Sequence, residues 1–164
     1  MSGIFAFLMT LIVSSVGFAQ SPECMANGRS LAVNNDQVLN WKESTRNQFR
    51  ARAHVSGTIR QIYLDHSQHH HYEVGIGPGP TDTVEVIYNE DFGGVPQVRV
   101  GSTLEACGDY ITSNAPSGPY PASPDGAIVH WVHMSPNPSR HDSGFITLDG
   151  VVCGQDTGSA GPKH

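Results

Sequence analysis

One segment near the C-terminus concentrates the side chains best suited to bind or react. It reads HWVHMSPNPSRHDSGF and holds, within twelve residues, His130, Trp131, His133, Arg140 and His141. Neutral imidazole is a common ligand of zinc and copper, so a site for either ion is one hypothesis. Because residues i and i+3 of a regular strand face opposite ways, His130 and His133 cannot share an ion within one strand. A strand that ends near Val132 would instead let His133 and His141 converge across the proline-containing turn.

The same rings also admit a structural interpretation, in which they are packed and hydrogen-bonded and Arg140 braces the loop. Against it, two histidines and a tryptophan in four positions are costly to bury, because each ring nitrogen needs a polar partner. We therefore expect a functional surface at this end of the chain. The candidate ligand-binding residues are His69, His130, Trp131, His133, Arg140 and His141, and the candidate metal ligands among them are His69, His133 and His141.

A second histidine-rich stretch, DHSQHHH, spans residues 65–71. Short histidine tracts bind transition metals opportunistically when they are flexible. This one falls between two predicted strands, so a solvated turn is the favoured interpretation and a metal-binding tract is the alternative.

A basic stripe follows the polar face of the first long predicted strand. Five of the nine lysines and arginines fall between Lys42 and Arg60. On a barrel, such a stripe would suit single-stranded nucleic acid or another polyanion. The neighbouring strands carry outward acidic residues, which favours ordinary cross-strand charge pairing. The net charge of −6 and the lack of stacking aromatics on this face make nucleic acid a weaker choice of partner.

Alternating apolar and polar residues predict the elements that must position these groups. In FRARAHVSGTIRQIY, residues 49–63, one face is apolar, and Gly57 allows the bend that closes a barrel. Further strands are predicted at 71–76, 83–89, 98–111 and 127–133, with a final hairpin of 145–148 and 151–153 around Asp149-Gly150. A helix is predicted at 36–47, capped by Asn34 or Asn35. The fold class is therefore mainly β, a small OB-like β-barrel of five to seven strands with one short N-terminal helix.

The N-terminus predicts export. Residues 1–22 carry no charged side chain, 4–16 are apolar over the length of a signal peptide, and Gly17 and Ala19 suit cleavage before Gln20. An uncleaved anchor is the alternative. We divide the chain into a signal peptide (1–19), an irregular lead-in (20–33), an OB-like β-barrel domain (34–153) and a flexible tail (154–164). After cleavage no stable membrane span remains, and the expected location is periplasmic or secreted. One disulfide is expected, with three pairings open among Cys24, Cys107 and Cys153.

The order His-Trp-x-His, Pro, Arg-His, then Gly with an aromatic resembles an uncharacterised family of bacterial secreted proteins, domain of unknown function 3465. The resemblance runs from the first strand to Val152. His69 matches the histidine that precedes the aromatic of the second strand. A His-Asn pair typically closes the third strand in that family, whereas this chain has Tyr88-Asn89. The resemblance implies a small OB-like barrel and an exported protein, and it implies no activity.

Two function classes follow from these features. Motifs for a nucleophilic serine, a zinc peptidase helix or a phosphate-binding loop are absent from the sequence. A ligand- or partner-binding module is therefore the first hypothesis, its partner being a small ligand, an oligosaccharide or an envelope protein. The alternative is a metal-dependent hydrolase, such as a secreted nuclease, that uses the histidine cluster with zinc or copper.

Overall fold

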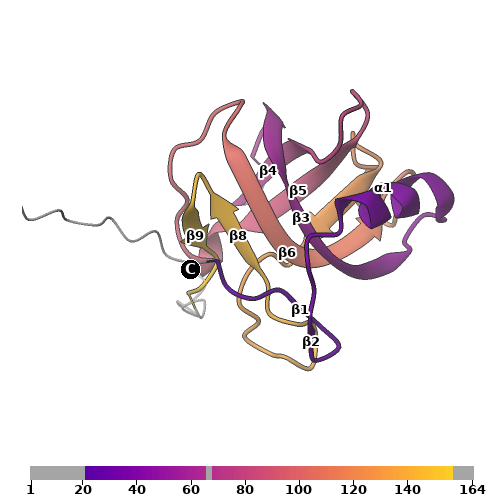
Figure 1. The fold of residues 1–164 in the computed structure, drawn as a ribbon. Helices are drawn as coiled ribbons and strands as arrows, with labels where there is room; N and C mark the ends of the chain where they lie inside the picture. Colours follow the sequence, from indigo (N-terminus) through magenta and orange to yellow (C-terminus); the bar gives the residue numbers. More distant parts are fainter. Residues whose placement is uncertain (1–20, 66–67, 157–164) are drawn as a thin grey trace, which may run out of the picture.

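Five strands close into a barrel in this computed structural model, which describes residues 21–65 and 68–156. They are β3 (Arg50–Ile62), β4 (His69–Gly75), β5 (Thr83–Asn89), β6 (Thr103–Thr112) and β7 (Ala127–His130). The order around the barrel is β3-β4-β5-β7-β6, and β6 pairs again with β3 to close it (Figure 1). Strands β5 and β7 run parallel and the other pairs are antiparallel. The predicted small OB-like barrel with one short helix is confirmed.

Shorter elements flank the barrel. Helix α1 (Asn35–Ser44) precedes β3, the 3-10 turn η1 (Glu90–Phe92) follows β5, and the hairpin β8 (Phe145–Leu148) and β9 (Val151–Cys153) extends the sheet beyond β6. A separate two-stranded sheet is formed by β1 (Met25–Ala26) and β2 (Arg29–Ser30). In Figure 1 the loop from β7 to β8, in orange, runs beneath the barrel beside this small sheet. That loop carries most of the candidate site.

The long strand β3 serves two partners because it bends. Its first part pairs with β6 from Arg50 to Thr58, and its second part pairs with β4 from Thr58 to Ile62. A Cβ atom at Gly57 would lie 2.1 Å from the carbonyl oxygen of Gly75, so only glycine allows the two backbones to approach this closely. The predicted bend at Gly57 therefore lies where β3 passes close to β4, and a register shift follows at Arg60.

The core lies inside the barrel and is built from one face of every strand. Val55, Val74, Val86 and Val129 have no exposed surface, while their sequence neighbours point outward. Helix α1 covers one end by burying Val38 and by placing the Trp41 ring against those of Phe49 and Tyr110, with centroids 5.9 and 5.4 Å away. The inward face is thus fully committed to packing, so the outward face carries the candidate site.

Several predicted boundaries need correction. The lead-in at 20–33 is not wholly irregular, since 25–30 form the β1–β2 hairpin. The second strand starts two residues early, at His69, and the helix ends at Ser44. The fourth strand starts at Thr103, after the turn at 99–102 closed by a hydrogen bond from the Ser102 amide to the Arg99 carbonyl. The hairpin at Asp149-Gly150 is as predicted, with φ of 47° and 82°, because a type I′ turn needs positive φ at both positions.

The predicted ends of the chain fall partly outside the description. The signal peptide at 1–19 lies outside the described residues, as does 157–164 of the predicted tail. The described part of that tail is bonded to the barrel, since the Met134 amide donates to the carbonyl of Gly154 and the Asp156 amide to that of Phe92. The ordered domain therefore extends past Cys153 to residue 156. No helix in the described part of the chain is long and apolar enough to cross a membrane.

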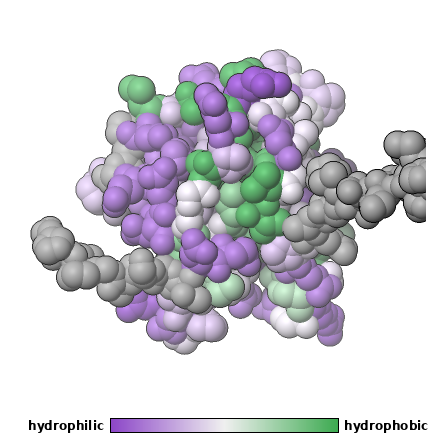
Figure 2. All heavy atoms as spheres, turned by 90° about the vertical axis from the view of Figure 1, so that its left-hand side faces the viewer, coloured by the Kyte–Doolittle hydropathy of each residue, from purple (hydrophilic) through white to green (hydrophobic). Residues whose placement is uncertain are grey.

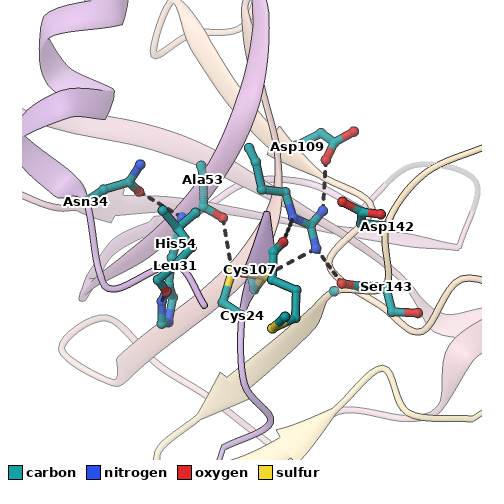
Figure 3. Close-up of a disulfide and its surroundings, with 12 residues drawn as sticks. Cys24, Leu31, Asn34, Ala53, His54, Cys107, Asp109, Asp142 and Ser143 are labelled. Atoms are coloured by element: carbon teal, nitrogen blue, oxygen red, sulfur yellow. Dashed lines mark hydrogen bonds and ion pairs between the residues drawn. A yellow bond between two sulfur atoms is a disulfide. The ribbon is translucent and has the colours of Figure 1, made fainter. Parts of the chain in front are cut away.

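A disulfide joins Cys24 to Cys107, and Cys153 is a buried free thiol. The bond fastens the N-terminal segment to the outer face of β6 (Figure 3). Structural disulfides persist in oxidising compartments, so the bond indicates a location outside the reducing cytoplasm.

The surface is largely hydrophilic. Figure 2 shows the face on the left of Figure 1, where a narrow apolar strip is framed by polar side chains. Large apolar side chains with most of their surface exposed are few among the described residues, led by Leu64 at 83% and Tyr120 at 72%.

Candidate functional site

Outward-facing residues of five neighbouring strands meet on one side of the barrel. His69 of β4 lies opposite Asn89 of β5, and His130 of β7 lies opposite Asp109 of β6. Arg50, at the start of β3, lies on the same side. All five alternate with core residues along their strands, so the sheet itself sets their direction.

The loop after β7 folds over this surface and encloses a hollow of about 510 Å³, which we call the ring cleft. Its lining residues are Arg50, His69, Asn89, Phe92, Asp109, His130, Trp131, His133, Pro136, Asn137, Arg140 and His141. All six residues predicted to bind ligand are among them. Phe92, Asn137 and Asp109 were not expected there. Phe92 and Asp109 reach the cleft through contacts with distant segments, so their sequence neighbourhoods carry no signal for it, whereas Asn137 lies inside the histidine-rich segment 130–145 itself.

A backbone kink at Trp131 places His133 on the same side of the barrel as His130 and His141. Strand β7 was expected to run to His133, but it ends at His130 because Trp131 has a φ of +54°. Val132 then turns into the core and His133 returns to the cleft side. The amide of Gly144 donates to the carbonyl of His133 over 2.7 Å, which holds the loop in this conformation.

The aromatic side chains form one continuous series of neighbouring rings. The centroid distances are 6.0 Å for His69–His130, 4.8 Å for His130–Trp131, 5.8 Å for Trp131–His141, 5.2 Å for His141–His133 and 3.5 Å for His133–Phe92. The guanidinium carbon of Arg50 lies 5.5 Å from the centroid of the Trp131 ring, within the range of a cation–π contact. Flat ring faces therefore dominate the lining, beside the guanidinium groups of Arg50 and Arg140.

Backbone carbonyls decide which ring nitrogens carry the protons. Nδ1 of His133 lies 2.9 Å from the Met134 carbonyl, and Nδ1 of His141 lies 3.0 Å from the Asp142 carbonyl. A carbonyl only accepts, so both Nδ1 atoms are donors and, in the neutral rings, both Nε2 atoms carry a lone pair. Nε2 of His141 is 3.4 Å from the Ser135 hydroxyl, which can donate to it. This is the tautomer that metal-ligating histidines adopt.

The predicted metal set is nevertheless not assembled. Within residues 21–65 and 68–156, no three His, Cys, Asp or Glu side chains are placed to hold one metal ion. His69 stands beside His130, whereas His133 stands beside His141, and the Trp131 ring neighbours both His130 and His141. The set His69, His133 and His141 is therefore divided between two pairs of neighbouring rings.

Burial keeps the inner histidines neutral. Desolvation lowers the pKa of His130 to about 4, and the nearby His69, His133, His71 and His141 add to the effect. Desolvation also lowers the pKa of His133, against the opposing hydrogen bond to Met134. Near neutral pH these rings therefore act as flat, uncharged surfaces with one donor and one acceptor nitrogen.

We expect His130 to make the fold acid-sensitive. Its pKa is lower in the folded chain than the usual 6.5, so the unfolded chain binds the extra proton more readily. The stability that depends on a neutral His130 is fully present above about pH 6.5. As the pH falls toward 4, the free energy of unfolding decreases by at most about 1.4 kcal/mol per pH unit. Urea unfolding of wild type and His130→Phe at pH 7 and pH 5 checks this, and the variant should show the shallower loss. An NMR titration of the His130 ring with a midpoint near 6.5 would contradict it.

The tract at 65–71 is not a solvated turn over its described part. His69, His70 and His71 belong to β4. Nδ1 of His70 lies 2.9 Å from an Asp65 carboxylate oxygen and its Nε2 lies 2.5 Å from one of Glu90, while Nδ1 of His71 lies 2.7 Å from Glu85. Residues 66 and 67 lie outside the description. Two of these histidines are thus engaged by carboxylates, which explains their presence without a metal.

The residues of the basic stripe have three different kinds of partner. Arg52 forms an ion pair of 2.8 Å with Asp109, and His54 lies 2.8 Å from Glu105, as charge pairing predicts. Arg60 instead donates to the carbonyls of 77, 79 and 80. Arg50 lies over Trp131. A continuous basic track for a nucleic acid is therefore not formed by this face.

Arg52 also ties the disulfide to the site. Its guanidinium contacts Asp109, the Met25 carbonyl, the sulfur of Cys107 and the carbonyl of Ser143. Figure 3 shows Asp109, Cys107 and Ser143 close to one another beside the disulfide. Because Ser143 ends the loop that carries Arg140 and His141, the disulfide region supports one wall of the ring cleft.

No protein-family model, curated protein or solved structure matches the chain. Since one barrel fold hosts many functions, the function has to be argued from the site itself.

Proposed function

We propose that this chain is an exported bacterial binding module, periplasmic or secreted, whose ligand occupies the ring cleft. The observation that carries the proposal is a single hollow that gathers residues of three separate segments, namely Arg50 of β3, His69 of β4, and Trp131, His133, Arg140 and His141 of the loop after β7. The proposed export rests on the predicted signal peptide and agrees with the disulfide. Membership of the uncharacterised secreted family that the sequence resembles is part of the same proposal.

The size and lining of the cleft favour a small ligand or part of an oligosaccharide. A hollow of about 510 Å³ is within the usual range for small-molecule sites. Stacked rings offer flat apolar faces, and Asn89 and Asn137 add polar groups that can orient a ligand. An envelope protein would have to insert a side chain into the same space. Nucleic acid remains the weaker choice because the net charge is −6 and the neighbouring Arg52 on β3 is paired with Asp109.

The alternative of a metal-dependent hydrolase, such as a secreted nuclease, has one supporting observation. His133 and His141 adjoin and have the tautomer suited to metal binding. A catalytic metal needs two or three protein ligands and an open position. No third ligand joins this pair among the described residues. Binding is therefore the first proposal and hydrolysis the second.

Ligand binding can be followed through Trp131. The chain has two tryptophans, so Trp41→Phe leaves Trp131 as the reporter. A panel of sugars, nucleotides and aromatic acids is added to the native protein while fluorescence is recorded, and metal content is measured in parallel. We expect at least one compound to change the Trp131 signal saturably. The double variant His133→Ala with His141→Ala should bind it at least about tenfold more weakly, which corresponds to about 1.4 kcal/mol.

The control removes a ring outside the cleft. Tyr120→Ala deletes an aromatic side chain that is 72% exposed and does not line the hollow. It should bind the compound as wild type does. If the double histidine variant folds, holds the same metal content and binds every partner unchanged, the motif is a structural brace and the proposal is wrong. Hydrolysis of a panel member that follows metal content would favour the alternative.

A further inference from the structure

Two arginines at the ring cleft have no anionic partner. Arg50 and Arg140 form neither an ion pair nor a side-chain hydrogen bond within the described part of the chain, although the protein is acidic overall, with a net charge of −6. The other arginine beside the cleft, Arg52, is saturated by Asp109 and backbone carbonyls. Guanidinium groups left unpaired at a cleft are ready to receive an anion.

Negative charge inside the cleft is already neutralised. The only carboxylate in its lining is Asp109, and the Arg52 guanidinium lies 2.8 Å from it. Asp142 lines a second hollow beside the cleft but not the cleft itself. With His130 and His133 uncharged near neutral pH, the cleft carries the excess positive charge of Arg50 and Arg140.

The arginines stand where the two hollows adjoin. The second hollow has a volume of about 370 Å³ and shares Arg50, Asp109, Arg140 and His141 with the ring cleft. A ligand that occupies both hollows would place its charged group between the two arginines. Its ring would then lie against Trp131 and the histidine rings. Arginine presents a planar donor fork that matches carboxylate or phosphate, which neither indole nor neutral imidazole can do.

We propose that the ring cleft recognises a small anionic ligand that joins a carboxylate or phosphate to a ring whose face can stack on an indole, with Arg50 and Arg140 as the anion contacts and Trp131 as the stacking surface. The inference rests on the proposed function and deepens it by naming the ligand class. A uronic sugar, an aromatic acid and a nucleoside monophosphate share this chemistry. They differ in the ring that must stack, so an experiment can separate them.

The test uses matched pairs in which one member carries the anionic group and the other lacks it. Digalacturonate is compared with digalactose, phenyl phosphate with phenol, and adenosine monophosphate with adenosine, each titrated into the Trp41→Phe protein. In at least one pair, the anionic member should bind about tenfold more tightly or better, since a charge-assisted hydrogen bond is worth more than a neutral one. The pair that shows the difference identifies the ring. Raising salt should weaken only the anionic member.

Arginine variants then locate the contact. Arg50→Gln and Arg140→Gln should each remove most of the affinity difference between the anionic member and the neutral member of a pair. Arg99→Gln is the matched control, because Arg99 is exposed and lines neither hollow. It should bind both members as the parent does.

The outcomes separate the inference from the proposed function. Equal affinity within every pair, no binding of any anionic member, or an equal loss in Arg99→Gln overturns the anion inference. The proposed function then still stands if a neutral compound changes the Trp131 signal, and it fails if no compound of the wider panel does so.

Discussion

Replacing Cys24 and Cys107 together by serine is expected to lower the free energy of unfolding by about 4 kcal/mol. The disulfide closes a loop with a sequence separation of 83, and a loop of this length removes much conformational entropy from the unfolded chain. Both cysteines are buried, so their loss also loosens the segment that packs on β6. Urea unfolding of the purified domain, with and without a reductant, measures the effect.

The remaining cysteine provides the control. Cys153 is a buried free thiol in the core, and Cys153→Ala should cost about 1 kcal/mol through lost packing alone. Reductant should bring wild type close to the double serine variant, yet leave that variant unchanged. If reductant leaves the stability of wild type unchanged, the disulfide contributes nothing and the expectation is wrong.

The second large effect is expected from Gly144→Ala. A Cβ atom at this position would lie 2.2 Å from the carbonyl oxygen of Cys107 and 2.5 Å from that of Trp131, and neither backbone atom can move freely. Relief of the clash requires the loop to separate from β6, which costs about 2–3 kcal/mol of stability. The same movement breaks the hydrogen bond that fixes His133, so the ring cleft should also lose its ligand.

Gly94→Ala is the matched substitution. A Cβ atom at Gly94 meets nothing within 4 Å, and its backbone is not in the left-handed region. It should change the free energy of unfolding by less than about 0.5 kcal/mol. Thermal unfolding and the Trp131 fluorescence titration are read for both variants. Equal stability of the two, or unchanged ligand binding in Gly144→Ala, would contradict the proposed packing of the loop.

The approach of His133 to His141 shows where inference from sequence succeeded. The period of two along a strand separates buried from outward side chains, and along residues 49–63 it predicts the buried face that includes Val55 and Ile59. The prolines at 136 and 138 indicated a turn that could return His141 toward His133. Both predictions rest on local geometry, so they hold whatever the rest of the chain does.

The metal hypothesis shows what residue types alone do not decide. Residue types named three ligands, yet His69 lies beside His130 whereas His133 lies beside His141, and Trp131, two residues before His133, has a positive φ. Nothing in the sequence predicts that a non-glycine residue adopts this conformation, since it is stabilised by later segments that pack around it. The tract at 65–71 was misjudged for a related reason. Its carboxylate partners, Glu85 and Glu90, come from the next strand and turn.

The sequence by itself determined the barrel, the hairpin at Asp149-Gly150 and the set of residues that face outward, because these depend on alternation, turn chemistry and other local preferences. Only the tertiary structure decided which cysteines pair, which carboxylate neutralises Arg52, and which arginines are left free to meet a ligand. Those choices are made by contacts between residues far apart in the chain. For each contact the chain offers several residues of suitable chemistry, and the fold brings only some of them within reach of one another.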